Sequence, residues 1–125
     1  MSDRRAIPLE QRGVLAVTGE DARAFLQGLT SNDVNRVAAD RALWSALLTP
    51  QGRFLFEFFM VEHDGALLLE CETARRDDLL RKLSMYKLRS KVGVAKRDDL
   101  SVFALIGEGS AQALGLPDEA GAAAP

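Results

Sequence analysis

The apolar positions of the chain form short runs of strand length and two stretches of helical spacing. The strand-length runs occupy residues 13–17, 43–48, 53–61 and 66–72. Residues 49–52 (Thr-Pro-Gln-Gly) and 63–65 (His-Asp-Gly) have the composition of tight turns. Because these turns separate the last three runs, the sequence predicts a three-stranded antiparallel meander.

Two helices are expected from spacings of three and four residues between apolar side chains. The apolar faces consist of Ala22, Phe25, Leu26 and Leu29 in the first helix, and of Leu79, Leu80, Leu83 and Tyr86 in the second. Thr18 and Thr73 precede these faces and are expected to cap the helices with their hydroxyls, with Asp21 completing a short capping box in the first.

Two further strands are expected at 92–95 and 101–106, so the predicted order is β-α-β-β-β-α-β-β. This order indicates an α+β fold in which two helices cover one face of a mainly antiparallel sheet. Residues 1–107 would form the domain. Residues 108–125 are rich in Ala and Gly and poor in large apolar side chains, so we expect a flexible tail or linker there.

Composition places the chain among globular proteins, with 125 residues, 47% hydrophobic and 27% charged. No apolar run reaches the roughly 18 residues of a membrane span. The N-terminus lacks the apolar stretch of a secretory signal, and a single cysteine fits a reducing compartment, so a cytoplasmic location is expected.

Charge is distributed unevenly along the chain. Residues 75–97 hold nine Lys or Arg and two Asp, a balance of +7, whereas the rest of the chain carries −9. Such a segment could bind an anionic partner, or it could simply be the solvated face of a helix.

Glu57 is the first candidate for chemistry, because it is the lone charge in the apolar run 54–61. A carboxylate among aromatic residues faces a pocket, is hydrogen-bonded, or lies at a rim in water, and the sequence leaves these alternatives open. Trp44 could stack on a ligand ring or fill the core. Cys71 is expected to be a structural thiol and His63 an exposed turn residue, and neither has the companions that a metal or nucleophile site requires.

Three segments resemble a known family in their order along the chain. They are QRGVLAVTGEDARAFL near the start, FLQGLTSNDVNRVAADRALWSALLTPQGR over 25–53, and YKLRSKVGV over 86–94. Together they resemble the folate-binding family of the glycine-cleavage T-protein, an aminomethyltransferase, and its YgfZ-type relatives, which serve iron–sulfur cluster assembly. The resemblance covers residues 9–107, and the last segment favours the YgfZ branch. The motif K-G-C-Y-x-G-Q-E of that branch is absent from these 125 residues, so we expect the N-terminal portion of such a protein.

The resemblance also implies a set of ligand-binding residues. In the transferases a Gly-Gly-x-x-Asp-Asp segment follows the same hairpin, and its second Asp works beside the folate. Here Phe56 and Glu57 stand at the two Asp positions. Trp44 matches a Tyr that lines the folate pocket, while Val61 stands where the transferases have another pocket Tyr.

Asn32 and Asp33 match a Thr-Asn-Asp segment of the family, although their own chemistry is typical of a helix exit and turn. The resemblance therefore implies that Trp44, Glu57, Asn32 and Asp33 help to bind tetrahydrofolate.

Three functional hypotheses follow. The favoured one is a YgfZ-like folate-binding protein that assembles or repairs iron–sulfur clusters, affects tRNA modification indirectly, and has assembly proteins or client enzymes as partners. The alternatives are a fragment of an aminomethyltransferase, with Glu57 as its candidate catalytic acid, and a non-catalytic interaction domain that uses residues 75–97. We do not expect a membrane or a nucleic acid as a direct partner. We do expect that the chain can form a homodimer.

Overall fold

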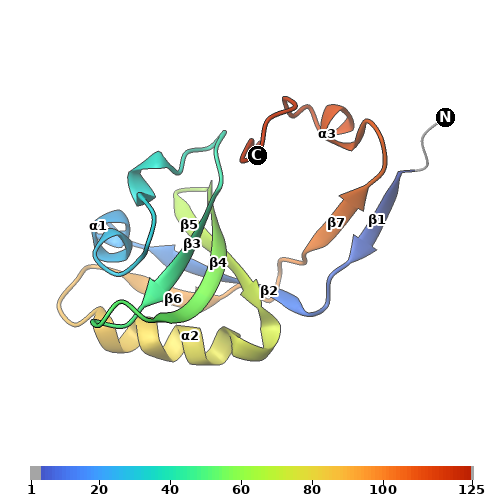
Figure 1. Cartoon of the computed structure of the whole chain (residues 1–125). Coiled ribbons are helices and arrows are strands. Elements are labelled where there is room, and N and C mark those ends of the chain that lie inside the picture. Colours follow the sequence, from blue (N-terminus) through green and yellow to red (C-terminus); the bar gives the residue numbers. More distant parts are fainter. Residues whose placement is uncertain (1–3, 125) are drawn as a thin grey trace.

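The structure is a computed structural model that describes residues 4–124, and its centre is an antiparallel sheet in the strand order β3-β4-β5-β2-β6 (Figure 1). Within residues 4–124 the strands are β1 (Arg5–Pro8), β2 (Arg12–Thr18), β3 (Leu43–Leu48), β4 (Phe54–His63), β5 (Ala66–Glu72), β6 (Gly93–Lys96) and β7 (Phe103–Ile106). The helices of the same residues are α1 (Ala22–Gln27), the 3-10 helix η1 (Val34–Arg36), α2 (Thr73–Tyr86) and α3 (Ser110–Ala113). The α+β class is confirmed.

The predicted meander is confirmed as β3-β4-β5, with Trp44 opposite Phe59 and Met60 opposite Leu69. Pro50 and Gly52 lie in its first turn, where the Gly52 N–H donates to the Thr49 carbonyl (2.8 Å) and Gly52 has a φ of 84°. β2 then pairs with β5 on one side and β6 on the other.

Both main helices cover the same face of this sheet, as expected. Phe25 and Leu26 of α1 and Leu79 and Leu83 of α2 belong to one apolar core. The strands contribute the side chains that point to that face, namely Leu15, Val17, Leu47, Phe56, Phe58, Met60, Leu67, Leu69 and Cys71. Burial of these residues is the main force that stabilises the fold. The opposite face has a smaller cluster of Val14, Ala16, Ala66 and Leu68.

Both predicted helix caps are wrong. Thr18 ends β2 opposite Gly93, and Gly19 then turns the chain with a φ of 106°, so α1 begins only after Asp21. Asp21 makes no side-chain cap bond to α1, and its carboxylate instead accepts the Lys91 N–H (2.8 Å). Thr73 is the first residue of α2, and its hydroxyl donates to the Glu10 carbonyl (3.0 Å). The side chains expected to cap the helices are thus engaged in tertiary contacts instead.

The pair β1–β7 forms a separate two-stranded ribbon that projects from the main sheet (Figure 1). β1 was not expected from the sequence, and the strand predicted at 101–106 is shorter and pairs with β1 outside the main sheet. Pro8 lies in β1. Because proline has no backbone N–H to donate, it suits an edge strand such as this one.

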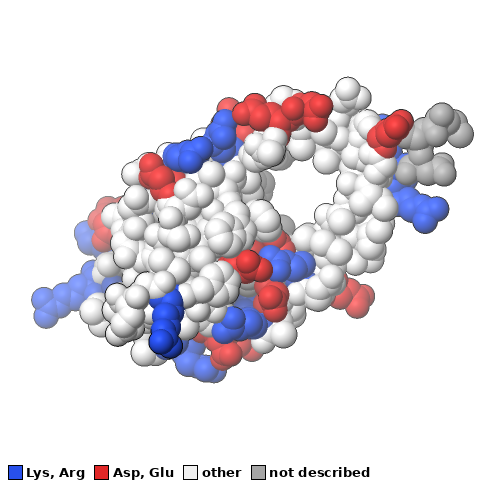
Figure 2. All heavy atoms as spheres, viewed as in Figure 1, with Lys and Arg blue, Asp and Glu red and all other residues white. Residues whose placement is uncertain are grey.

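Residues after the ribbon turn back toward the body of the protein. α3 follows Gly109, and the Ala42 N–H then donates to the Gly121 carbonyl (2.7 Å) while Arg41 pairs with Glu119 (3.3 Å). Figure 2 shows an opening between this returning segment and the body. The division into a domain and a flexible tail at residue 107 remains a prediction.

Candidate functional site

The candidate site is the part of the β3–β4 face that no helix covers. On β4, Phe56, Phe58 and Met60 are buried under the helices. Because side chains alternate along a strand, Glu57 and Phe59 point to the opposite face. The sequence left the direction of Glu57 open, and the burial of its two neighbours decides it.

Trp44 and Phe59 lie directly opposite each other on adjacent strands of this face. Trp44 is 43% exposed and Phe59 48% exposed, so both rings remain available to a ligand. Cross-strand neighbours are close enough for their side chains to touch. The interpretation of Trp44 as a core residue is therefore wrong, and the two rings form an exposed aromatic pair.

Phe59 is a candidate that the sequence analysis missed. The signal was available in the alternation of β4, because assigning Phe56 and Phe58 to the core puts Phe59 on the face of Glu57. Four phenylalanines in one apolar run concealed this pattern.

Glu57 lies opposite Ala46 and is exposed. Among residues 4–124 no ion pair or side-chain hydrogen bond involves its carboxylate. Ala46 is two residues from Trp44 on β3, so Glu57 and Trp44 are diagonal neighbours on one face. The structure thus brings together Trp44 and Glu57, which the sequence analysis singled out, and adds Phe59.

Asn32 is joined to this site through the backbone. Its side-chain amide donates to the Trp44 carbonyl (2.9 Å), and its backbone N–H donates to the Ser45 hydroxyl (3.2 Å). The Asp33 carboxylate accepts the Asn35 N–H (3.0 Å) and so caps the start of η1. The Asn32 side-chain oxygen also accepts the Asp33 N–H (2.8 Å), so both side chains bond nearby backbone, as the turn interpretation predicted. The bond to Trp44 in addition holds the start of β3 in place.

Arg12 and Glu70 border the aromatic pair on the same sheet. Glu70 lies opposite Phe59, and both of its carboxylate oxygens accept hydrogen bonds from Arg12, one of them from Nη2 at 3.1 Å. The hydrogen bond to Glu70 raises the pKa of Arg12 further above its ordinary value. This bidentate pair is fixed in geometry and gives the site a polar border.

Cys71 and His63 differ sharply in their surroundings. Cys71 is 3% exposed, and burial raises the pKa of its thiol to about 11, so it is a structural, unreactive thiol as expected. His63 is half-exposed, and its Nε2 lies 3.3 Å from the Asp64 carboxylate.

Residues 4–124 contain no group of three or more His, Cys, Asp or Glu arranged to hold a metal ion.

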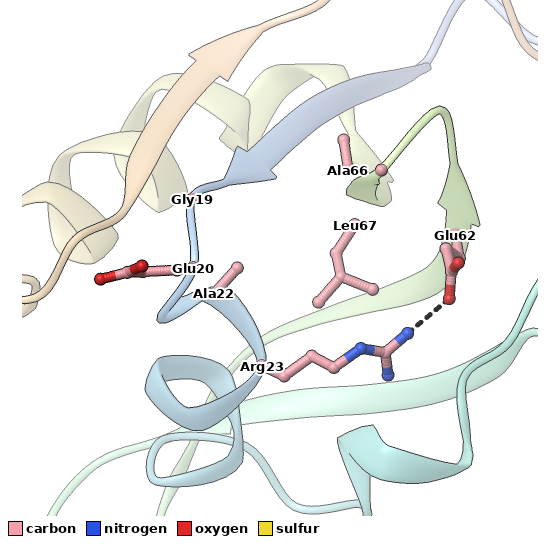
Figure 3. A pocket seen from close by; sticks show the side chains of 8 residues that line it. Gly19, Glu20, Ala22, Arg23, Glu62, Ala66 and Leu67 are labelled. Atoms are coloured by element: carbon pink, nitrogen blue, oxygen red, sulfur yellow. Dashed lines mark hydrogen bonds and ion pairs between the residues drawn. The ribbon is translucent and has the colours of Figure 1, made fainter.

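A cavity of about 230 Å³ lies between the start of α1 and the β4–β5 hairpin (Figure 3). Arg23 points across it to Glu62, and its other terminal nitrogen donates to the Val34 carbonyl (2.9 Å). Glu20 at its rim pairs with Lys91 (2.9 Å). The bonds of Arg23 connect α1 with η1 and β4 across this cavity.

None of the helices in the described part of the chain is long and apolar enough to cross a membrane.

The chain is similar to known proteins in sequence and in fold. No family model matches the chain. It is 34% identical over 132 residues to the human protein "Iron-sulfur cluster assembly factor IBA57, mitochondrial", which covers 93% of this chain and 37% of that protein. It is 28% identical to the "tRNA-modifying protein YgfZ" of Colwellia psychrerythraea, covering 82% of this chain and 32% of that protein.

A similar fold occurs in the glycine cleavage system aminomethyltransferase T of Bartonella henselae, with a TM-score of 0.76 and 19% identity, over 91% of this chain and 32% of that one. That identity shows a shared fold alone. The chain spans about a third of the length of the curated relatives it matches. These findings show that the chain is homologous, over most of its own length, to part of the IBA57 and YgfZ proteins.

Proposed function

We propose that this chain is part of a YgfZ-type protein that assembles or repairs iron–sulfur clusters, with indirect effects on tRNA modification. The support is its similarity, over most of its length, to a protein named as an iron–sulfur cluster assembly factor. The single observation that carries the role of the site is the exposed pair Trp44 and Phe59 beside Glu57.

In this proposal the helix-free face forms one wall of a tetrahydrofolate site. The residues present fit such a ligand, because exposed aromatic rings offer a flat stacking surface and a free carboxylate accepts hydrogen bonds from ring N–H groups. Trp44 and Phe59 would stack on the pterin, and Glu57 would orient it. Tetrahydrofolate supplies a one-carbon carrier when bound. Asn32 would act on the ligand indirectly, by holding β3 and therefore Trp44 in position. Asp33 would have a smaller role, by shaping the turn before β3.

Cluster-ligating thiolates are assigned to partner proteins. Fe–S clusters take several cysteine ligands, and the one cysteine of this chain is buried in the core. Assembly proteins or client enzymes are the partners that we propose, by similarity to a protein named as an iron–sulfur cluster assembly factor. A reduced, buried thiol also suits the cytoplasmic location that we propose, although the IBA57 relatives are named as mitochondrial.

An aminomethyltransferase is the second candidate, supported by the fold likeness. Two positions weigh against it. Phe56, at the place of the first family Asp, is buried in the core, and Val61 stands in place of a pocket Tyr. Of the two Asp positions of the transferase segment, only the second has an acid in this chain, namely Glu57.

The interaction-domain alternative is weakened by the ion pairs of residues 75–97. Within the described residues, five of the nine cations of this segment pair with carboxylates, namely Arg76, Arg81, Lys91, Lys96 and Arg97. A paired charge contributes less to binding an outside anion, so a nucleic-acid partner is not proposed.

The test uses cells that lack their own YgfZ-type protein and carry the natural gene that encodes this chain. The activity of a reporter enzyme that requires a [4Fe–4S] cluster is measured. Trp44→Ala and Glu57→Gln are expected to lower it, whereas Arg36→Ala, at an exposed position of η1, leaves it unchanged. Full reporter activity with both site variants would refute the role of this face. Failure of the unaltered gene to restore activity would refute the family function itself.

A further inference from the structure

A second surface lies at the opposite end of β3, where α1, the β3–β4 turn and α2 come together. It is a groove of about 590 Å³. Its lining is mainly apolar or lacks side chains, and consists of Gly28, Leu29, Thr30, Leu48, Thr49, Pro50, Gly52 and Tyr86. Met85 precedes Tyr86 in the sequence and Leu88 follows it by two residues; they are 57% and 85% exposed. We call the groove with Met85 and Leu88 the α2-end surface.

Leu88 has a backbone conformation that leucine rarely adopts. Its φ is 42°, in the left-handed region that helices commonly enter just after their last turn, usually with glycine. The side chain gains no burial in return, because 85% of it is exposed. Both the backbone conformation of Leu88 and the exposure of its apolar side chain to water cost free energy. This combination points to a contact with another molecule.

The charge of the α2-end surface has a single sign. The three segments that meet there, residues 22–32, 43–56 and 79–97, contain no Asp or Glu. Arg53 follows the lining residue Gly52 in the sequence, and Lys87 and Arg89 follow Tyr86. None of the three has a carboxylate partner among residues 4–124, and Lys87 donates to the Val92 carbonyl (3.5 Å). On the face drawn in Figure 2, the end that holds the β3–β4 turn in Figure 1 carries white and blue spheres.

We infer that the α2-end surface docks a partner protein through a segment that carries an apolar side chain flanked by acidic residues. The apolar side chain fills the groove against Tyr86 and Leu48, and Leu88 packs on the partner. The acidic residues pair with Arg53, Lys87 and Arg89. The groove favours a protein segment over a lipid surface, because a concave site matches a single inserted side chain. This inference does not depend on the folate-binding face.

The experiment selects peptides from a random display library on the whole chain, and then measures the affinity of a synthetic copy of the most enriched peptide. Enriched peptides are expected to combine Asp or Glu with Leu, Phe or Trp. The affinity should fall about tenfold or more in Leu88→Gly and in the double variant Lys87→Glu with Arg89→Glu. The matched control Arg36→Glu should keep the affinity of the unaltered chain.

Leu88→Gly is a suitable variant because glycine adopts a positive φ without strain, so the circular dichroism spectrum and melting temperature should be retained or improved. The inference is overturned if no peptide is enriched or if the enriched peptides lack acidic residues. It is also overturned if Leu88→Gly and the Lys87→Glu, Arg89→Glu double variant bind the peptide as tightly as the control. It is also overturned if the unaltered chain, but not Leu88→Gly, sediments with vesicles of equal phosphatidylglycerol and phosphatidylcholine without binding any peptide. That result would identify a membrane contact instead.

Discussion

Glu57 and Phe58 are neighbours in the sequence with opposite surroundings. Phe58 is fully buried beneath the helices, whereas Glu57 is exposed on the other face of the sheet. The carboxylate keeps its hydration there, so the folded state carries no desolvation cost for it. This explains how an acid can be placed in the middle of an apolar strand.

Glu57→Gln is therefore expected to leave stability nearly unchanged. The free energy of unfolding, measured by urea titration, should change by no more than about 0.5 kcal/mol. The control is Glu70→Gln, which breaks the half-buried bidentate pair with Arg12 and should cost roughly 1–3 kcal/mol. A loss in Glu57→Gln as large as in the control would mean that a structural ion pair holds Glu57.

Cys71 should make stability depend on pH in the alkaline range. Burial raises the pKa of its thiol in the folded state from 9.0 to about 11. Its contribution is fully present below pH 9 and is lost as the pH rises toward 11, because the unfolded chain then releases the proton first. The loss is about 1–3 kcal/mol.

The measurement compares the unfolding free energies of the unaltered chain and Cys71→Ala at several pH values. The advantage of the unaltered chain should shrink between pH 9 and 11, because the two proteins differ only in the thiol. A constant difference over this range would contradict a raised thiol pKa.

At the scale of elements, the passage from β2 to α1 depends on Gly19. Its φ is 106°, and a Cβ added there would lie 2.1 Å from the Lys91 carbonyl oxygen. The segment before β6 therefore passes directly over this turn. Asp21 strengthens the same joint by accepting the Lys91 N–H.

Gly19→Ala is expected to destabilise the protein by about 2–4 kcal/mol, since it adds a backbone clash to the strain of a positive φ. Gly65→Ala is the matched control, because Gly65 also has a positive φ (77°) but open space around its Cβ position. It should cost only about 1 kcal/mol. Thermal unfolding of both variants tests this, and equal losses would show that strain alone, without the contact with residue 91, sets the cost.

At the scale of the whole molecule, the two faces of the sheet are covered unequally. α1, η1 and α2 cover one face, and the other keeps Trp44 and Phe59 half-exposed. A ligand site needs walls on several sides to enclose most of its ligand. The chain covers about a third of its relatives' length, so other parts of a longer protein could supply those walls.

Tetrahydrofolate is therefore expected to bind these 125 residues weakly or not at all. Titration followed by the fluorescence of Trp44, the one tryptophan of the chain, should give a dissociation constant no tighter than about the millimolar range. Trp44→Phe, with no indole signal, is the blank. Micromolar binding would show that this face forms a complete site by itself.

The 125-residue chain is also expected to self-associate, most simply as a two-fold dimer. Of the four phenylalanines in 54–61, Phe54 and Phe59 remain 55% and 48% exposed, and exposed apolar patches tend to find partners. Sedimentation at micromolar concentration should show a species heavier than 13.6 kDa, and Phe59→Ser should reduce it. A monomer at all concentrations would show that the exposed rings are tolerated in water.

The sequence by itself determined the elements whose signals are local. Apolar periodicity and the turn at 49–52 predicted the meander and both main helices, because side-chain spacing fixes which face of an element is apolar. Burial of Cys71 and the turn roles of Asn32 and Asp33 also followed from residue chemistry.

Only the tertiary structure decided features that depend on residues distant in sequence. Thr18 and Thr73 have the composition of helix caps, yet pairing with β6 and bonding to Glu10 gave them other roles. The β1–β7 ribbon joins residues about a hundred positions apart, and no local pattern specifies such a pairing. The direction of Glu57, and with it the exposed pair of Trp44 and Phe59, was set by which neighbours the helices buried.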